Sequence, residues 1–229
     1  MLSAYRHGII PFPAADEFHQ TVHEVRYEDE VEAGVIGLVG AAGDQADPYA
    51  VAWWCPDPRL VLAAGRVHLG RNVRKALRRG HQWTTADTAF ARVAEQCRAG
   101  REPRWLTDTL LDSLVVLHEK GWAHSVEVWQ DDELVGGAFG VAVGPVLSGD
   151  SIFGRRPEAA RIAVADLAAR FAAAGGELID AQWDSPFLRS LGAAPMPRAE
   201  FLARLEGPAE RTVLPTERRP ARRLLPDPS

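Results

Sequence analysis

The sequence contains little cysteine. Cys55 and Cys97 are the only two among 229 residues, and they lie far apart. Neither belongs to a cluster with the spacing of metal ligands, so the sequence supports neither a disulfide framework nor a zinc site. We therefore expect a reducing, cytoplasmic location and no metal or cofactor.

Long apolar runs are also missing. No stretch approaches the roughly 18 consecutive apolar residues that a membrane helix needs, and Met1 to Pro13 lacks the apolar core of a signal peptide. The composition, with 46% hydrophobic and 25% charged residues, is that of an ordinary globular chain. We expect a soluble monomer with no membrane partner.

An excess of positive charge is lacking too. The net charge is −5, whereas proteins that coat nucleic acid by bulk electrostatics are usually strongly basic. Charge is nevertheless uneven, because residues 16–47 are rich in Asp and Glu while a later stretch is basic. That stretch is either a solvated face or an edge that contacts phosphate. Its main residues are Arg71, Arg74, Lys75, Arg78 and Arg79.

Several familiar catalytic signatures are absent. The chain has no Gly-x-x-x-x-Gly-Lys-Ser/Thr loop, no His-Glu-x-x-His helix and no Gly-x-Ser-x-Gly elbow. His118 and His124 flank a predicted helix-to-strand turn, where a histidine is more often a structural residue than a catalytic one. The segment Gly149-Asp150-Ser151 is either an ordinary turn or a site for a carbonyl oxygen or phosphate near a helix N-terminus.

The apolar pattern predicts an α+β protein. Strands are expected at 60–62, 124–129, 134–143 and 178–183, and helices at 72–79, from about Thr85–Asp87 to Cys97, at 110–120 and from Pro157 to Gly175. The later order, strand, strand, helix, strand, fits an acetyltransferase-like (GNAT-like) sheet among several α+β folds. Residues 154–157 lack the glycine-rich pyrophosphate turn of an acyl-CoA site, which favours another acyl donor.

Three parts are predicted along the chain. Residues 1–65 form a small N-terminal domain with an acidic loop, and residues 66–206 form the GNAT-like domain. The Pro- and Arg-rich residues 207–229 are expected to be a disordered tail.

Two polar residues stand out in an apolar strand. Asp180 and Gln182 are two positions apart, so both side chains point to the same face of the sheet. They are either a hydrogen-bonded structural pair or a carboxylate and an amide that face a cleft.

A series of segments, taken in order, resembles the leucyl/phenylalanyl-tRNA–protein transferase family and covers most of the chain. They are Ala4-Tyr5-Arg6-His7-Gly8-Ile9-Ile10-Pro11, Trp53 to Arg59, Leu117-His118, Ala123 to Trp129, Leu134 to Gly137, Gly149 to Phe153, Leu178 to Gln182, Ser190 to Ala193 and Pro197-Arg198. The resemblance implies a GNAT-like enzyme that uses Leu- or Phe-charged tRNA as donor. The acceptor would be a protein that begins with Arg or Lys, as a step toward N-degron degradation.

The resemblance also implies site residues. Asp180 and Gln182 match the catalytic pair, and Asp150 is expected to bind an ammonium group. The terminal adenosine is expected near Phe12 and Trp105, and Trp53, Trp54 and Ser151 are expected at the substrate surface. The donor side chain is expected to fill an apolar pocket. The pocket positions are Ala138, Leu147, Ile152, Val164, Leu167 and Phe171.

Some positions depart from the family pattern. Its usual Gly-Glu-Ser is Gly149-Asp150-Ser151 here, a usual Tyr is Leu114, and a usual Lys is Arg161. Two alternatives therefore stay open beside the transferase interpretation: a divergent enzyme with another donor (Met, for example) or acceptor, and a binding module for the tRNA end or a peptide that has lost turnover.

Overall fold

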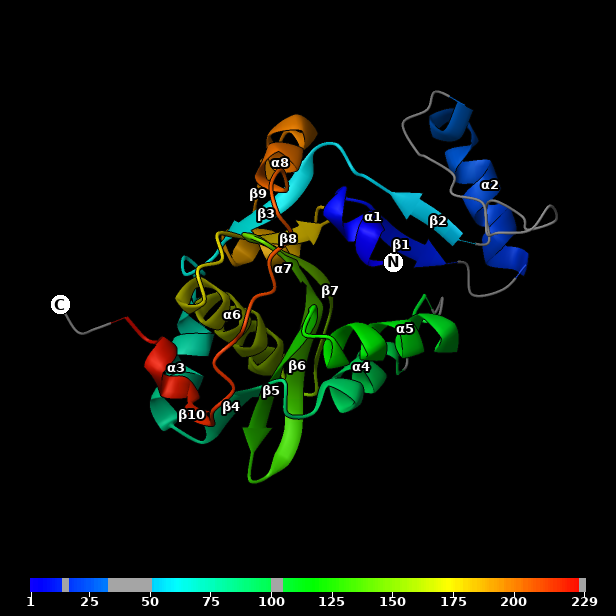
Figure 1. Cartoon of the computed structure of the whole chain (residues 1–229). Coiled ribbons are helices and arrows are strands. Elements are labelled where there is room, and N and C mark those ends of the chain that lie inside the picture. Colours follow the sequence, from blue (N-terminus) through cyan, green and yellow to red (C-terminus); the bar gives the residue numbers. More distant parts are fainter. Residues whose placement is uncertain (14–16, 33–50, 100–104, 227–229) are drawn as a thin grey trace.

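The structure is a computed structural model that describes residues 1–13, 17–32, 51–99 and 105–226. Within these ranges, no helix has both the length and the apolar character needed to cross a membrane. The chain forms an α+β structure around a mixed sheet, as the sequence predicts (Figure 1).

An eight-stranded sheet has the order β10-β4-β5-β6-β7-β8-β3-β9. All neighbouring strands are antiparallel except β7 and β8, which run parallel and are joined through helix α6. The strands are β3 (Arg59–Ala63), β4 (Gln82–Ala86), β5 (Ala123–Gln130), β6 (Glu133–Val143), β7 (Val146–Gly154), β8 (Leu178–Gln182), β9 (Ala194–Met196) and β10 (Arg219–Pro220).

Helices cover both faces of this sheet (Figure 1). On one face α6 (Pro157–Ala173) packs across β5, β6 and β7, with α3 (Arg71–Arg79) beside it, and buries one large apolar cluster. On the other face α4 (Phe90–Arg98) and α5 (Asp108–Glu119) bury a second cluster. Local signals explain these helices, because Pro157 occupies the first turn of α6, Thr107 caps α5 and Gly80 ends α3 in the left-handed conformation.

The N-terminal part packs on the α4–α5 side. Helix α1 (Leu2–Arg6) leads into β1 (Ile10–Pro13), which pairs with β2 (Val51–Trp54) in a separate two-stranded sheet. Tyr5, Ile10 and Trp54 are buried in the same cluster as α4 and α5. Helix α2 (Glu17–Glu32) stands away from the sheet (Figure 1). The predicted domain boundary at residue 65 stays a prediction, although β3, just before it, belongs to the large sheet.

The predicted disorder of the C-terminal segment is wrong for residues 207–226. After α7 (Pro186–Ser190) and α8 (Arg198–Arg204), β10 pairs with β4 and a short 3-10 helix, η2 (Ala221–Leu224), follows. Leu214 and Ala221 are buried in the α6-side cluster. Composition suggested disorder, but these apolar side chains and the strand pairing give the segment a fixed place.

Two local predictions also need correction. Thr85 and Ala86 end strand β4 instead of capping a helix, and α4 begins only at Phe90. Gly149-Asp150-Ser151 lies inside β7 and is not a turn, a strand that the Gly- and Ser-containing sequence does not predict.

Candidate functional site

Four polar side chains meet where the parallel strands β7 and β8 run side by side. The Gln182 amide Nε2 donates to Asp150 Oδ1 at 3.0 Å and lies 3.3 Å from Ser148 Oγ. Asp180 Oδ1 accepts from the Gln182 backbone N–H at 2.9 Å, and its Oδ2 accepts from Ser148 Oγ at 3.4 Å. Asp180 and Gln182 thus both contact Ser148 Oγ, although the strand is irregular between them, and the structure adds Asp150 to the pair.

An irregularity in each strand aims these side chains. Gly149 and Ser151 pair with the consecutive residues Gly140 and Phe139, so Asp150 is the extra residue of a bulge in β7. A Cβ on Gly140 would lie 2.1 Å from the Ser148 carbonyl oxygen, so glycine is required opposite the bulge. In β8 a second register shift falls at Ala181, and Gln182 has a positive φ of 62°. Bulges of this kind redirect side chains beside active sites.

A buried ion pair holds Asp180. Arg59 Nη2 lies 2.9 Å from Asp180 Oδ2, and both side chains are almost fully buried. The same nitrogen donates to the Gly8 carbonyl at 2.8 Å, and the guanidinium lies over the Phe201 ring at 4.4 Å. Burial raises the pKa of Asp180, and the Arg59 cation acts against this shift. Arg59 therefore joins the N-terminal part to the carboxylate of β8.

Asp150 has hydrogen-bond donors but no cation among the described residues. The Tyr5 hydroxyl donates to Asp150 Oδ2 at 2.9 Å, opposite the Gln182 contact. Burial raises the pKa of Asp150 to about 8, the bonds from Tyr5 and Gln182 lower it, and the nearby Asp180 raises it further. The pKa of Tyr5 is raised well above its ordinary value, mainly by burial and by the Asp150 charge.

The site therefore contains two carboxyl groups and one guanidinium. Arg59 pairs with Asp180, which leaves Asp150 protonated near neutral pH in the free protein. Asp150 is also partly exposed to solvent, so a ligand can reach it. The arrangement is suited to a cationic group that approaches Asp150 and replaces its proton.

The six positions expected to form the donor pocket lie together on the α6 side of the sheet. Val164, Leu167 and Phe171 come from α6 and pack in the same cluster as Ala138 and Leu147. Ile152 is half-buried against this cluster. The structure thus brings the six together; their role as a pocket stays a prediction.

The other residues expected to bind substrate differ in their burial and contacts. Trp54 is buried, and its ring meets Trp183, the neighbour of Gln182, edge-on with centroids 5.3 Å apart. Trp105 is half-buried against the α4–α5 cluster. Ser151 is buried, and its hydroxyl has no hydrogen-bond partner among the described residues. The side chains of Phe12 and Trp53 lie outside the described part of the chain.

The basic stretch forms one face of α3. Val73 and Leu77 bury the opposite face, and the helix contains no acidic residue. Across the residues that the structure describes, the five basic side chains make no ion pair or hydrogen bond, whereas Arg98, Arg155 and Arg189 are paired with carboxylates. The five are Arg71, Arg74, Lys75, Arg78 and Arg79.

The histidine pair is structural. His124 Nδ1 lies 2.8 Å from Asp87 Oδ2, and His118 Nδ1 lies 2.9 Å from the Ala123 carbonyl. The His118 ring stacks on Phe90 with centroids 4.4 Å apart. Both rings thus anchor the end of α5 to β5 and to the β4–α4 turn.

Sequence reasoning missed three residues of the polar cluster: Tyr5, Arg59 and Ser148. The first two lie in the segments Ala4 to Pro11 and Trp53 to Arg59, whose likeness to the family was a usable signal. Their contacts span 145 and 121 positions, however, so no local pattern links them to β7 or β8. Ser148 lies two residues before Asp150, which is the spacing of residues that share one face of a strand. Because β7 was not predicted, this spacing was not used.

Comparison with known proteins gives a consistent result. The family model "Leucyl/phenylalanyl-tRNA protein transferase" matches residues 61–206. Proteins named leucyl/phenylalanyl-tRNA–protein transferase are similar: one from Anaeromyxobacter sp. (strain K) is 41% identical over 168 residues, 72% of each chain. One from Azoarcus sp. (strain BH72) is 43% identical over 164 residues, 70% of each chain. One from Aromatoleum aromaticum is 37% identical over 216 residues, 91% of this chain and 78% of the relative.

Proposed function

The chain belongs to the leucyl/phenylalanyl-tRNA–protein transferase family, and from this premise we propose that it transfers a leucyl or phenylalanyl group from charged tRNA to the N-terminus of a protein that begins with Arg or Lys. The product would be a destabilised, N-degron protein in the cytoplasm, and the enzyme would act as a monomer. The observation that carries the proposal is the hydrogen-bonded Asp150–Gln182–Asp180 cluster in a member of this family.

The reaction needs orientation more than strong base catalysis. An aminoacyl ester is already activated, and an α-amino group with a pKa of about 7.7 to 8.0 is already neutral in about a tenth or more of the molecules at pH 7. The amine nitrogen attacks the ester carbonyl, the C–N bond forms, the ester C–O bond breaks, and the amine proton ends on the ribose hydroxyl of tRNA. The reaction therefore needs no reactant other than the charged tRNA and the acceptor amine.

Gln182 is assigned to orient the amine. Its side-chain Nε2 is engaged by Asp150 and Ser148, which leaves the amide oxygen to accept a hydrogen bond from the acceptor amine. Asp180 fixes the Gln182 backbone through the 2.9 Å hydrogen bond, and Arg59 holds Asp180 in turn. Pre-organisation of this kind reduces the entropy that is lost when the reactants reach the reactive geometry.

Asp150 is assigned to bind the acceptor ammonium and to take up its proton. The pKa of Asp150, about 8, lies close to that of an α-amino group, so proton exchange between the two is nearly balanced. The buried Ser151 hydroxyl, without a partner among the described residues, is available to a substrate oxygen or nitrogen beside it.

The donor is expected to lie between two groups of residues. Its side chain would enter the α6-side cluster of Ala138, Leu147, Ile152, Val164, Leu167 and Phe171, within a GNAT-like arrangement of β6, β7, α6 and β8. The terminal adenosine would lie near Phe12 and Trp105. The cations of α3 would contact tRNA phosphates.

One measurement tests the proposal directly. Purified protein is given tRNA charged with labelled Leu, Phe or Met, together with a peptide that begins with Arg or a matched peptide that begins with Ala. We expect transfer of Leu or Phe to the Arg peptide only. Binding of charged tRNA without transfer to either peptide would contradict the proposed reaction and favour a binding module.

A further inference from the structure

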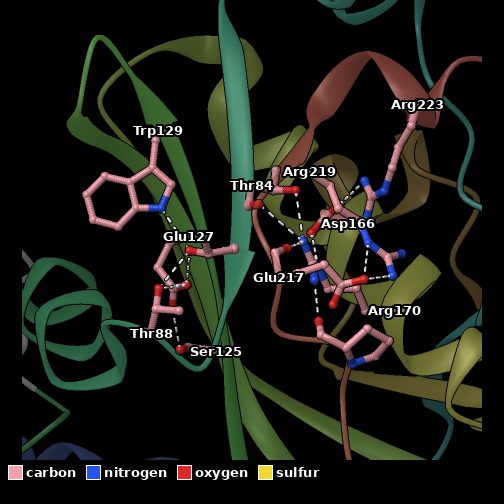
Figure 2. A network of polar contacts seen from close by, with 12 residues as sticks. Thr84, Thr88, Ser125, Glu127, Trp129, Asp166, Arg170, Glu217, Arg219 and Arg223 are labelled. Carbon is pink, nitrogen blue, oxygen red and sulfur yellow. Dashed lines mark hydrogen bonds and ion pairs between the residues drawn. The ribbon is translucent and has the colours of Figure 1, made fainter.

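A buried charged cluster joins α6 to the C-terminal segment. Asp166 and Arg170 lie one turn apart on α6, both fully buried, and form an ion pair of 2.6 Å between Arg170 Nε and Asp166 Oδ2. Figure 2 shows the Arg170 side chain pointing between strand β4 and the segment that carries Glu217 and Arg219.

The Arg170 guanidinium binds three backbone carbonyl groups at once. Its Nη2 donates to the Thr84 carbonyl of β4 at 3.2 Å and to the Glu217 carbonyl at 3.0 Å, and its Nη1 donates to the Pro215 carbonyl. Arg223 of η2 forms a second ion pair with Asp166 (Figure 2). A buried guanidinium with several fixed acceptors has a well-defined position.

This cluster lies beside the α6 residues that face the sheet. Leu167 directly follows Asp166 and Phe171 directly follows Arg170, so each apolar side chain is about 100° around the helix from a member of the ion pair. Leu167 and Phe171 are fully buried in the α6-side cluster. A small rotation or shift of α6 would therefore move both the charged and the apolar flank.

We propose that Arg170 is a positioning residue for donor selection: it holds α6 against β4 and the C-terminal segment, and thereby sets the width of the apolar space for the donor side chain. The inference rests on the proposed transfer reaction. A pocket discriminates side chains that differ by one methylene by about 10- to 200-fold, so a displaced helix alters the choice between Leu and Phe.

The test uses variants that leave no fully buried charge without a partner. Removing Arg170 alone would leave the buried Asp166 with the partly exposed Arg223 as its remaining cation among the described residues, so the main variant is the double change Asp166→Leu/Arg170→Met, which replaces both charges by apolar side chains. Arg223→Gln is the milder variant, because Arg223 is partly exposed. Arg155→Gln is the matched control, since it breaks an exposed ion pair with Glu133 away from this cluster.

Two quantities are measured: amide hydrogen exchange along α6, and kcat/KM for Leu- and Phe-charged tRNA with an Arg peptide. We expect faster exchange in α6 and a change of about threefold or more in the Phe-to-Leu ratio of kcat/KM, in favour of the bulkier Phe, in the double variant. Arg223→Gln should shift the ratio less, in the same direction, and Arg155→Gln should not shift it.

Two results would overturn the inference. One is unchanged exchange in α6. The other is a parallel loss of both activities at a constant ratio, which is what a merely structural role predicts because it lowers only the amount of folded enzyme. Failure of the proposed function is distinguishable, since it shows as absence of Leu and Phe transfer by the unaltered protein.

Discussion

Gln182 donates a hydrogen bond from its side-chain amide to Asp150 at 3.0 Å, and this bond joins the residue that bulges from β7 to the last residue of β8. The left-handed φ of Gln182 and the extra residue at Asp150 are both needed for it. Because neither strand is regular at this point, the hydrogen bond depends on backbone geometry as much as on the two side chains.

Gln182→Ala should lower kcat/KM for transfer by about 100-fold, because the acceptor amine loses the group that orients it. The measurement is steady-state transfer to an Arg peptide. Asp184→Asn is the control, since Asp184 is exposed and lies two residues further along the chain. Rates near wild type for Gln182→Ala would remove it from the catalytic assignment.

Asp180→Asn should lower both transfer and stability. The substitution leaves the Arg59 guanidinium buried without its counter-ion, and breaking a buried pair on one side costs about 3 to 5 kcal/mol. Urea unfolding at pH 7 measures the free energy of unfolding, and transfer assays at a temperature where the variant stays folded measure the activity. An unfolding free energy equal to that of the wild type would show that the pair contributes little.

The pH dependence of transfer should be bell-shaped around pH 8. The rising side reports ionisation of Asp150 in the free enzyme, whose pKa is about 8, and the falling side reports loss of the acceptor's ammonium proton. Asp150→Asn should replace the bell by a lower curve that rises to a plateau, since only the neutral amine then reacts. Profiles of kcat/KM for the acceptor from pH 6 to 10 would show the difference.

Tyr5→Phe is a second test of whether Asp150 controls the pH dependence of transfer. The Tyr5 hydrogen bond lowers the pKa of Asp150, so its removal should move the rising side of the profile to higher pH. A bell that is unchanged in both variants would mean that Asp150 does not control the rate.

Stability should respond to pH through the same carboxyl group. Its folded-state pKa is raised, so its contribution to stability is complete below its unfolded-state pKa of about 3.9 and is lost as the pH rises through about 8. Between these values the free energy of unfolding should fall by at most about 1.4 kcal/mol per pH unit on account of Asp150. Asp150→Asn should lack this component. Urea unfolding at pH 5.5 and 8.5 measures it, and an equal change in the free energy of unfolding in both proteins would contradict the raised pKa of Asp150.

Binding of charged tRNA should weaken with salt, and less steeply when α3 is altered. If Arg74 and Arg78 bind phosphates, the double variant Arg74→Gln/Arg78→Gln should lower the slope of log K against log salt by about 0.9 for each phosphate that is no longer neutralised. Arg155→Gln/Arg189→Gln removes the same charge elsewhere on the surface and is the control. Equal slopes in both double variants would leave the α3 cations as a solvated face.

The sequence predicts the parts of the fold that local signals determine. The helix from Pro157, the cap at Thr107 and the β5–β6 hairpin are confirmed, because each is marked by residues within a few positions. Strand β7 was missed, since its Gly149-Asp150-Ser151 has the composition of a turn and its strand state depends on pairing with β6 and β8.

The candidate site was predictable only in part. Asp180 and Gln182 are visible from their spacing in one strand, whereas Arg59 and Tyr5 reach the site across the whole fold. Long-range contacts also decide the structure of the C-terminal segment. Its Pro- and Arg-rich composition indicates disorder, yet its carbonyl groups accept hydrogen bonds from the buried Arg170. Sequence gives the composition of such a segment but not the buried partner that orders it.

The pairing of β10 with β4 has a consequence for biosynthesis. Residues 219–223 are translated after every other strand of the large sheet, so until they leave the ribosome β4 presents an open edge and the Asp166–Arg170 pair lacks several of its partners. The nascent chain at that stage offers a template for pairing with another chain. The large sheet is thus complete only after residues beyond the segment that the family model matches have been made.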